Sequence, residues 1–184
     1  MAADVLNTDD TIDSRDVIAR VEELESDIES WNEDIDEHET NMSDLEEEIS
    51  EAEAEAQELD DDKDADEIEQ IENNIDGLRT DISDIEDNIK TIRDDISEAE
   101  EELNPLKAFA DEAEGYAPDW NYGATLVRDS YFEDYARELV NDIGDLPSEL
   151  PAYIENNIDW EGVADDIQAD YSSVDFDGEE YWVR

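Results

Sequence analysis

Apolar residues follow a heptad spacing over the first part of the chain. They recur at alternating steps of four and three in one run over residues 17–59 and in a second run over residues 68–106. Such spacing puts the apolar side chains on one stripe of a helix and predicts a coiled coil. Residues 60–66 interrupt the pattern with the sequence DDDKDAD, whose polar character predicts a turn. Residues 14–107 are therefore predicted to form a long antiparallel coiled-coil hairpin.

The position of the turn sets the register of this hairpin. Facing core residues have numbers that sum to 127, so that Trp31 faces Ile96 and His38 faces Ile89. No small core residue faces another small one in this register. Because a cavity costs stability in proportion to its size, the complementary volumes support the register.

The few basic residues of the hairpin agree with the register. They flank the seam: the register places Arg79 between Glu46 and Glu53, Arg93 between Asn32 and Glu39, Lys107 beside Glu25, and Arg20 near Glu102. An exposed pair contributes about 0 to 1 kcal/mol, so these charges specify register more than stability. Elsewhere Asp27 faces Asp95, and such like-charge pairs predict a hairpin whose stability depends on salt.

The pattern changes beyond the hairpin. Residues 108–123 contain two glycines and a proline and are predicted to be a linker, and residues 1–13 are predicted to be a flexible tail. Residues 124–184 are predicted to form a small α+β module with two helices and a C-terminal β-hairpin. The predicted fold class is therefore mainly α, with the long antiparallel coiled-coil hairpin followed by this module.

Local signals mark the elements of the module. They are a strand over 125–128, a helix capped by Asp129 or Ser130 and ended by Gly144, a helix capped by Asp159, and a β-hairpin over 174–183 that turns at Asp177-Gly178. The second helix carries its apolar residues at helical spacing from Trp160 onward.

The charge of the chain is extreme. It has 63 acidic and 10 basic residues, which gives a formal net charge of -53, and it contains no cysteine. Residues 1–113 carry 44 acids and 7 bases, and residues 114–184 carry 19 acids and 3 bases. Because both parts are strongly acidic, adaptation to molar intracellular salt explains the composition better than mimicry of a nucleic-acid backbone. No secretory signal or transmembrane stretch is present, so a cytoplasmic protein is expected.

No motif in the sequence specifies a catalytic or metal-binding site, because carboxylates are so abundant that their spacing carries no information. His38 is the only histidine and falls in the coiled-coil seam. Asp60, Asp62 and Asp64 imitate the start of a calcium loop, but Ala65 replaces the glycine at its sixth position. We therefore expect no enzyme activity, no cofactor and no metal site.

Three aromatic residues are candidates for binding a partner. Trp120 and Tyr122 lie in the predicted linker. Trp182 alternates out of phase with Tyr181 and Val183, which suggests an exposed face of the β-hairpin.

Two stretches resemble a segment of ArdA-type antirestriction proteins. They are SYFEDYARELVNDIG and IDWEGVADDIQADYSSVDFDGEEYWVR, with an aromatic-rich helix ending in Ile143-Gly144, Asp159-Trp160 opening a helix, and an Asp-Gly hairpin. The resemblance implies the fold of residues 124–184. It also implies an activity, since proteins of that family inhibit type I restriction-modification enzymes by presenting an acidic surface that imitates DNA. That family strings several such modules together, whereas this chain has one.

These features favour a non-catalytic protein–protein interaction or scaffold protein of a salt-adapted archaeon or its virus or plasmid. The alternative is an antirestriction DNA mimic, because residues 14–107 carry about one net negative charge per 2.3 Å of rod, compared with one per about 1.7 Å of duplex DNA. A component of virus assembly is a third reading. We expect a protein partner, no direct nucleic-acid binding and no membrane role, and the sequence leaves a homodimer through the hairpin open.

Overall fold

A computed structural model describes residues 5–59, 64–143 and 151–184 of the chain. The chain divides into two compact units, which we call the hairpin unit (residues 26–100) and the sheet unit (residues 1–25 and 101–184). Two long helices, α1 (Ser14–Glu58) and α2 (Ala65–Glu114), contribute to both units. The predicted mainly α fold with a long antiparallel helical hairpin and a small sheet is confirmed.

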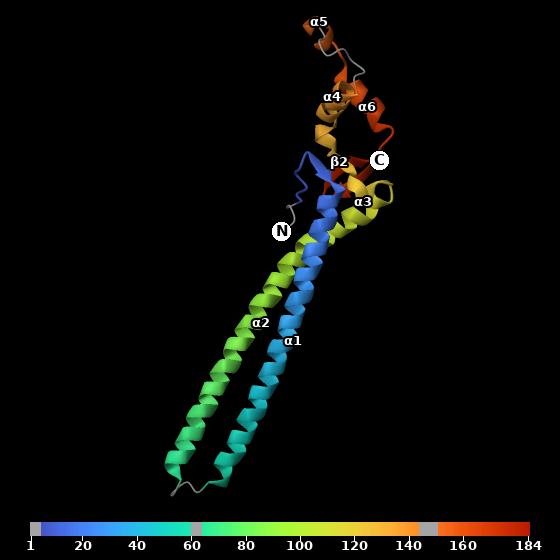
Figure 1. Ribbon diagram of the computed structural model, residues 1–184. Coiled ribbons are helices and arrows are strands. Elements are labelled where there is room, and N and C mark those ends of the chain that lie inside the picture. Colours follow the sequence, from blue (N-terminus) through green and yellow to red (C-terminus); the bar gives the residue numbers. More distant parts are fainter. Residues whose placement is uncertain (1–4, 60–63, 144–150) are drawn as a thin grey trace. The chain divides into compact units, whose positions relative to one another are not determined.

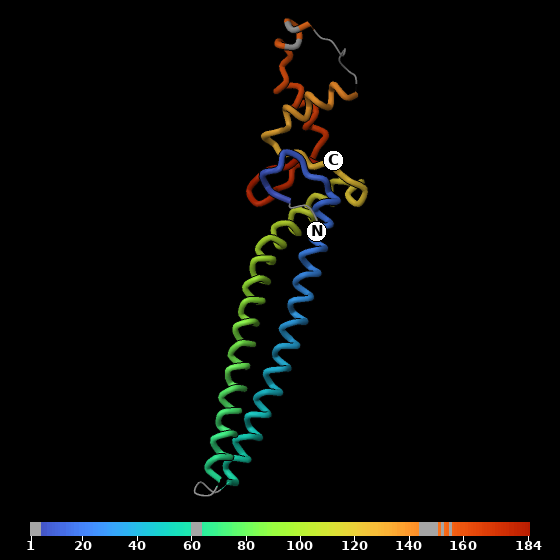
Figure 2. Tube along the Cα trace, turned by 60° about the vertical axis from the view of Figure 1, so that its left-hand side comes forward, coloured from blue at the N-terminus to red at the C-terminus, as the bar shows by residue number. Residues whose placement is uncertain are grey.

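In the hairpin unit, α1 and α2 lie side by side and run in opposite directions (Figures 1 and 2). Within residues 26–58 and 65–100, every residue predicted for the seam is buried or half-buried, and every other residue is exposed. This one-sided burial is what a two-helix coiled coil requires. Helix α2 begins inside the predicted turn, and residues 60–63, with Asp60 and Asp62, lie outside the described residues.

Ion pairs confirm the predicted register. In the hairpin unit, Arg79 Nη2 lies 2.9 Å from Glu53 Oε1, and Arg93 Nη2 lies 2.9 Å from Glu39 Oε1. Arg79 therefore pairs with Glu53 rather than Glu46. The two remaining predicted pairs form within the sheet unit, with Lys107 Nζ at 2.6 Å from Glu25 Oε1 and Arg20 Nε at 2.7 Å from Glu102 Oε1.

The sheet unit is built on four antiparallel strands in the order β1-β2-β4-β3. These are β1 (Thr11–Asp13), β2 (Thr125–Arg128), β3 (Ser172–Phe176) and β4 (Glu179–Val183). The predicted strand β2 and the β3–β4 hairpin are confirmed. Asp177 (φ 51°) and Gly178 (φ 87°) form the two-residue turn, whose left-handed backbone suits these residue types.

Strand β1 corrects the prediction of a flexible tail over residues 1–13. Thr11–Asp13 pairs with β2, and Ile12, opposite Leu126, is only 4% exposed. A strand of three residues has too few positions for a visible alternation, and its partner lies far away in the sequence.

One face of the sheet is covered by the end of α2. The Phe109 ring stacks on Phe176 with centroids 4.5 Å apart and meets Tyr181 edge-on at 5.7 Å. The predicted linker over 108–123 is therefore wrong, because α2 continues to Glu114 and a short helix, α3 (Trp120–Gly123), follows. The apolar spacing does persist past Leu106, since Phe109 and Ala113 are both buried. These two residues pack in the sheet unit rather than in the coiled-coil seam.

The other face of the sheet is covered by helices α4 (Phe132–Asp142) and α6 (Trp160–Gln168). Val127 of the sheet, Phe132 and Ala136 of α4, and Ala164 of α6 form a core cluster, against which Trp182 packs. A 3-10 turn (η1, Asp129–Tyr131) leads into α4, and a short helix, α5 (Ala152–Glu155), lies between α4 and α6 in the sequence.

The predicted helix caps have different outcomes. The Asp159 side chain accepts a hydrogen bond from the Gly162 N–H at 3.2 Å, so it caps α6 as predicted. Helix α4 has no side-chain cap; instead, Asp129 Oδ1 accepts hydrogen bonds from Trp182 Nε1 (2.8 Å) and Gln168 Nε2 (3.2 Å). The predicted helix stop at Gly144 lies outside the described residues.

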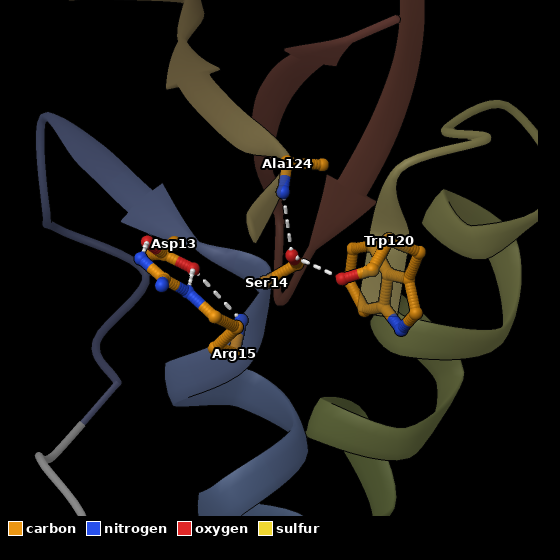
Figure 3. A network of polar contacts seen from close by, with 5 residues as sticks. All are labelled: Asp13, Ser14, Arg15, Trp120 and Ala124. Carbon is orange, nitrogen blue, oxygen red and sulfur yellow. Dashed lines mark hydrogen bonds and ion pairs between the residues drawn. The ribbon is translucent and has the colours of Figure 1, made fainter. Parts of the chain in front are cut away.

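Ser14 joins the start of α1 to the segment that leads into β2 (Figure 3). It is fully buried, its Oγ donates to the Trp120 carbonyl at 2.6 Å, and the same oxygen accepts from the Ala124 N–H at 2.8 Å. The Ser14 N–H donates in turn to the Ala124 carbonyl at 2.9 Å. One hydroxyl therefore satisfies two backbone groups that water does not reach.

Candidate functional site

A groove of about 420 Å³ lies between α4, α6 and the C-terminal residue of the sheet unit. Its apolar lining is aliphatic. Its polar lining consists of Asp166 on α6, Asp170 just after α6, and Arg184. The lining residues are Leu139, Val140, Ile143, Val163, Asp166, Ile167, Asp170 and Arg184.

The groove arises because the apolar stripe of α4 is longer than its cover. Phe132 and Ala136, in the first half of the helix, are 2% and 0% exposed. Leu139 and Val140 are half-buried, and Ile143, directly after the helix, is 60% exposed. Among the described residues, the apolar stripe of α4 therefore extends past its cover, which makes its end a candidate contact surface.

Helix α6 forms the opposite wall in the same way. Ala164 is buried in the core cluster, whereas Val163 and Ile167 are half-buried. Leu139 with Ile143, and Val163 with Ile167, are each four residues apart, so each pair extends along one side of its helix. Together they make two aliphatic ridges with a groove between them.

Two carboxylates flank this apolar surface. Asp166 and Asp170 are exposed and lie four residues apart, at and just beyond the end of α6. Neither carboxylate forms a hydrogen bond or ion pair with any residue that the structure describes. The Arg184 guanidinium lies 5.1 Å from the centre of the Tyr171 ring, which places it over the aromatic face.

Aromatic side chains pack next to the groove. Phe132 meets Tyr135 and Tyr171 edge-on, and the hydroxyls of the two tyrosines lie 3.2 Å apart. Burial raises the pKa of Tyr171 well above its ordinary value. This phenol stays protonated at neutral pH and acts as a packing and hydrogen-bonding group rather than as a base.

A second tyrosine, on the opposite face of the sheet, is also held neutral. Burial raises the pKa of Tyr181 to about 12, and its hydroxyl donates to the Asp9 carbonyl at 2.6 Å. This bond links β4 to the segment that leads into β1. Neither tyrosine is poised for proton transfer at neutral pH.

Two of the three predicted partner-binding residues are buried or half-buried. Trp120 is 4% exposed and its carbonyl accepts a hydrogen bond from Ser14, so its side chain presents little surface to a partner. Trp182 is half-buried against Phe132, with its indole N–H on Asp129, because α4 and α6 cover the sheet face that was expected to be free. Tyr122 is 81% exposed, and its role in partner binding stays a prediction.

The groove itself was not predicted from the sequence. Its aliphatic residues were assigned to the inner faces of two amphipathic helices, which is correct for Phe132, Ala136 and Ala164. Ile143 offered the one available signal, since it ends the apolar stripe of its helix next to a glycine. Periodicity locates an apolar stripe, but it does not show how much of the stripe is covered.

Other features of the described residues suggest no chemistry. Among residues 5–59, 64–143 and 151–184, no group of three or more His, Cys, Asp or Glu side chains is arranged to hold a metal ion. None of the helices in these ranges is long and apolar enough to span a membrane. His38 is half-buried in the seam, as its spacing predicted. A shallow groove of about 400 Å³ in the hairpin unit has Ala56 and Ile75 among its lining residues, but otherwise it is lined by polar and charged side chains, including the Arg79–Glu53 pair.

Comparisons with protein-family models, with curated proteins and with solved structures find no significant match. The resemblance of the C-terminal segment to ArdA-type antirestriction proteins therefore stays a prediction. The function of the chain is inferred below from its own residues.

Proposed function

We propose that this chain is a non-catalytic protein–protein interaction protein in which the sheet unit holds a partner and the hairpin unit serves as a spacer or docking rod. The observation that carries the proposal is the aliphatic groove between α4 and α6. Ile143 is 60% exposed there, beside two carboxylates that pair with none of the described residues. Side chains of this kind are expensive to leave in water and gain free energy when a partner covers them.

The composition supports a salt-adapted archaeon, or its virus or plasmid, as the source. Residues 26–100 carry 32 acidic and 4 basic residues, and the acidic residues occupy positions outside the apolar seam. At an ionic strength of about 1 M the Debye length is about 3 Å, so carboxylates on neighbouring turns scarcely repel one another. A surface of this kind is suited to molar salt.

A pull-down with the full chain at about 1 M KCl tests the proposal, because that ionic strength suppresses long-range attraction to any cationic protein. We expect one partner from the lysate of a salt-accumulating archaeon, recovered in near-equal molar amount and identified by mass spectrometry. A matched column carrying an unrelated protein of similar acidity controls for charge. Recovery of the same proteins on both columns would overturn the proposal.

A second candidate function is that of an antirestriction DNA mimic. The row of positions that flanks the seam on the side of Asp27 and Asp95, which we call the acidic edge, favours this function. Between residues 26 and 100 every residue in this row is Asp, Glu or Asn. In contrast, Arg79 and Arg93 lie on the other edge, where they pair with glutamates. A row of acidic residues that contains no basic residue is a feature that a DNA-binding enzyme would recognise.

A restriction assay separates the two candidates. DNA mimicry predicts that the full chain inhibits cleavage by a type I restriction enzyme and that excess non-cleavable duplex DNA relieves the inhibition. It also predicts that replacing the Asp and Glu residues of the acidic edge with Asn and Gln abolishes the inhibition. Unchanged cleavage at saturating chain concentration would exclude this candidate for the enzyme tested and leave the interaction proposal standing.

A further inference from the structure

The geometry of the groove points to a defined class of occupant. We propose that the groove between α4 and α6 binds an amphipathic helix of a partner protein, with apolar residues on one stripe and Lys or Arg beside that stripe. This inference rests on the proposed function, because it names the partner chemistry of the same site.

The walls of the groove have the dimensions of a helix-binding site. Helices α4 and α6 contain 11 and 9 residues, which correspond to lengths of about 16 and 14 Å. A partner helix with apolar residues at i, i+3 or i+4, and i+7 presents about two turns of anchors, which matches these lengths. Leu139 and Ile143 on one wall, and Val163 and Ile167 on the other, would pack against those anchors.

The charges at the groove select the sign of the partner. Asp166 and Asp170 form no ion pair with any of the described residues, and their spacing of four residues matches two basic residues one turn apart on a facing helix. Arg184 also lines the groove, so a basic residue of the partner is disfavoured beside it. A partner helix would therefore bind in one direction, with its basic residues toward Asp166 and Asp170.

Charge also argues against a second copy of this chain as occupant. Two copies that met groove to groove would bring four aspartates to one interface, with only the two Arg184 side chains to offset their charge. The chain itself has ten basic residues against 63 acidic ones, so it offers few segments that match the two aspartates. A partner of opposite charge fits better than either alternative.

The affinity should come mainly from the aliphatic walls. At an ionic strength of about 1 M only charges in direct contact interact strongly, because the Debye length is about 3 Å. Apolar burial does not depend on such long-range attraction, and salts of the strongly hydrated kind strengthen it. The aspartates would then set specificity and direction, and the aliphatic residues would supply the binding free energy.

Binding of a synthetic peptide to the full chain tests the inference. The probe is an amphipathic peptide of about 18 residues, or five helical turns, made of Leu and Lys with the leucines on one stripe. A peptide of the same composition in scrambled order controls for charge, and both are titrated at about 1 M KCl to suppress attraction to the acidic hairpin. Calorimetry gives the affinity, and methyl NMR of Ile, Leu and Val residues gives the site.

We expect the amphipathic peptide to shift the methyl signals of Ile143 and Ile167, and the scrambled peptide to leave them in place. Ile143→Asp should weaken binding about tenfold or more, since it puts a charge on the apolar wall that the peptide would contact. Ile154→Asp on α5 is the matched control: Ile154 is also exposed and does not line the groove, so its substitution should leave the affinity unchanged. Circular dichroism checks that both variants fold.

The charge part of the inference has its own test. Reversing both aspartates in the double variant Asp166→Lys, Asp170→Lys should weaken binding of the Leu/Lys peptide and strengthen binding of a Leu/Glu peptide of the same pattern. Equal affinity of the wild-type chain for the Leu/Lys and Leu/Glu peptides would overturn the assignment of a basic partner.

Several other results would overturn the inference. They are equal binding of the scrambled peptide, full affinity in Ile143→Asp, nuclear Overhauser contacts that place another segment of the free chain in the groove, and a dimer of the wild-type chain that Ile143→Asp dissociates. The last would identify a second copy as the occupant.

The pull-down separates failure of this inference from failure of the proposed function. A partner that wild-type chain and Ile143→Asp retain equally would support the interaction function and reject the groove as its site. A wild-type chain that retains no specific partner would reject the interaction function, whatever the peptide does.

Discussion

The hairpin unit and the sheet unit bury their side chains in different ways. In the hairpin unit, burial is confined to one stripe per helix, and most seam residues stay half-buried between rows of exposed carboxylates. In the sheet unit, both faces of the sheet are covered, and Phe109, Leu126, Tyr181 and Val183 are at most 1% exposed. The hairpin unit therefore depends on screening of its charges, whereas the sheet unit depends on contacts that salt affects little.

The largest expected effect is the loss of stability when a cavity is made in the core of the sheet unit. Phe109→Ala removes a ring that touches both Phe176 and Tyr181, and such truncations of buried Phe cost about 3 to 5 kcal/mol of unfolding free energy. Urea unfolding followed by tryptophan fluorescence measures the loss, since three of the four tryptophans lie in the sheet unit. Leu45→Ala, at a half-buried seam position, should cost only about 1 to 2 kcal/mol. Equal losses would show that the two units are packed alike.

A smaller loss is expected at the buried hydroxyl of the sheet unit. Ser14→Ala leaves the Ala124 N–H and the Trp120 carbonyl without their partner in a place that water does not reach. Such a loss costs about 1 to 3 kcal/mol. Ser26→Ala, at an exposed helical position, serves as the control and should change stability by less than about 0.5 kcal/mol. A Ser14→Ala variant as stable as this control would contradict the role given to the hydroxyl.

Repulsion between facing carboxylates should lower the stability of the hairpin unit at low salt. Asp95→Lys replaces a predicted repulsion with Asp27 by an attraction, and should stabilise the hairpin by about 0.5 kcal/mol at about 0.1 M salt. Asp94→Lys, at an outer position that faces no other helix, changes the net charge equally and should stabilise less. Thermal unfolding at 222 nm compares the two variants, and their difference should vanish at about 2 M salt. A difference that persists at high salt would mean that charge does not govern this edge.

The smallest expected effect is a dependence on pH in the sheet unit. The Asp13 carboxylate accepts hydrogen bonds from the Arg15 side chain and backbone, which lowers the pKa of Asp13 below its ordinary value. A carboxylate with a lowered folded-state pKa adds stability above its unfolded value of about 4, and that stability is lost as the pH falls through the folded-state pKa. Asp13→Asn should therefore be less stable than wild type at pH 6, with the difference shrinking below about pH 4. A constant difference across this range would exclude the ionised pair as its cause.

The contacts of residues on α1 and α2 show why some side-chain partners were predictable and others were not. The pairs of Arg79, Arg93, Lys107 and Arg20 with glutamates followed from the spacing of the seam, because a heptad register relates every position on one helix to one on the other. Phe109 continues the same helical spacing but packs in the sheet unit, a change of partner that spacing alone does not reveal.

The candidate site was less predictable than the fold. Trp120 and Trp182 were candidates because they are large aromatic residues in a polar sequence. In the structure Trp120 is buried beside Ser14, and Trp182 packs against Phe132 of α4. The groove is made instead by ordinary aliphatic residues such as Leu139 and Val163. Their role depends on where the cover of the helices ends, and this is a property of the assembled layers.

The hairpin, the β3–β4 turn and the cap of α6 were predictable without the structure. Each of these depends on residues that are close in the chain or related by a regular repeat, so composition and spacing are sufficient. Only the tertiary structure decided that residues 11–13 form an edge strand, that Ser14 is buried, and that α4 and α6 leave a groove. These features arise where segments that are distant in the sequence pack together. The free energy of that packing depends on both segments, so the sequence of one segment does not reveal it.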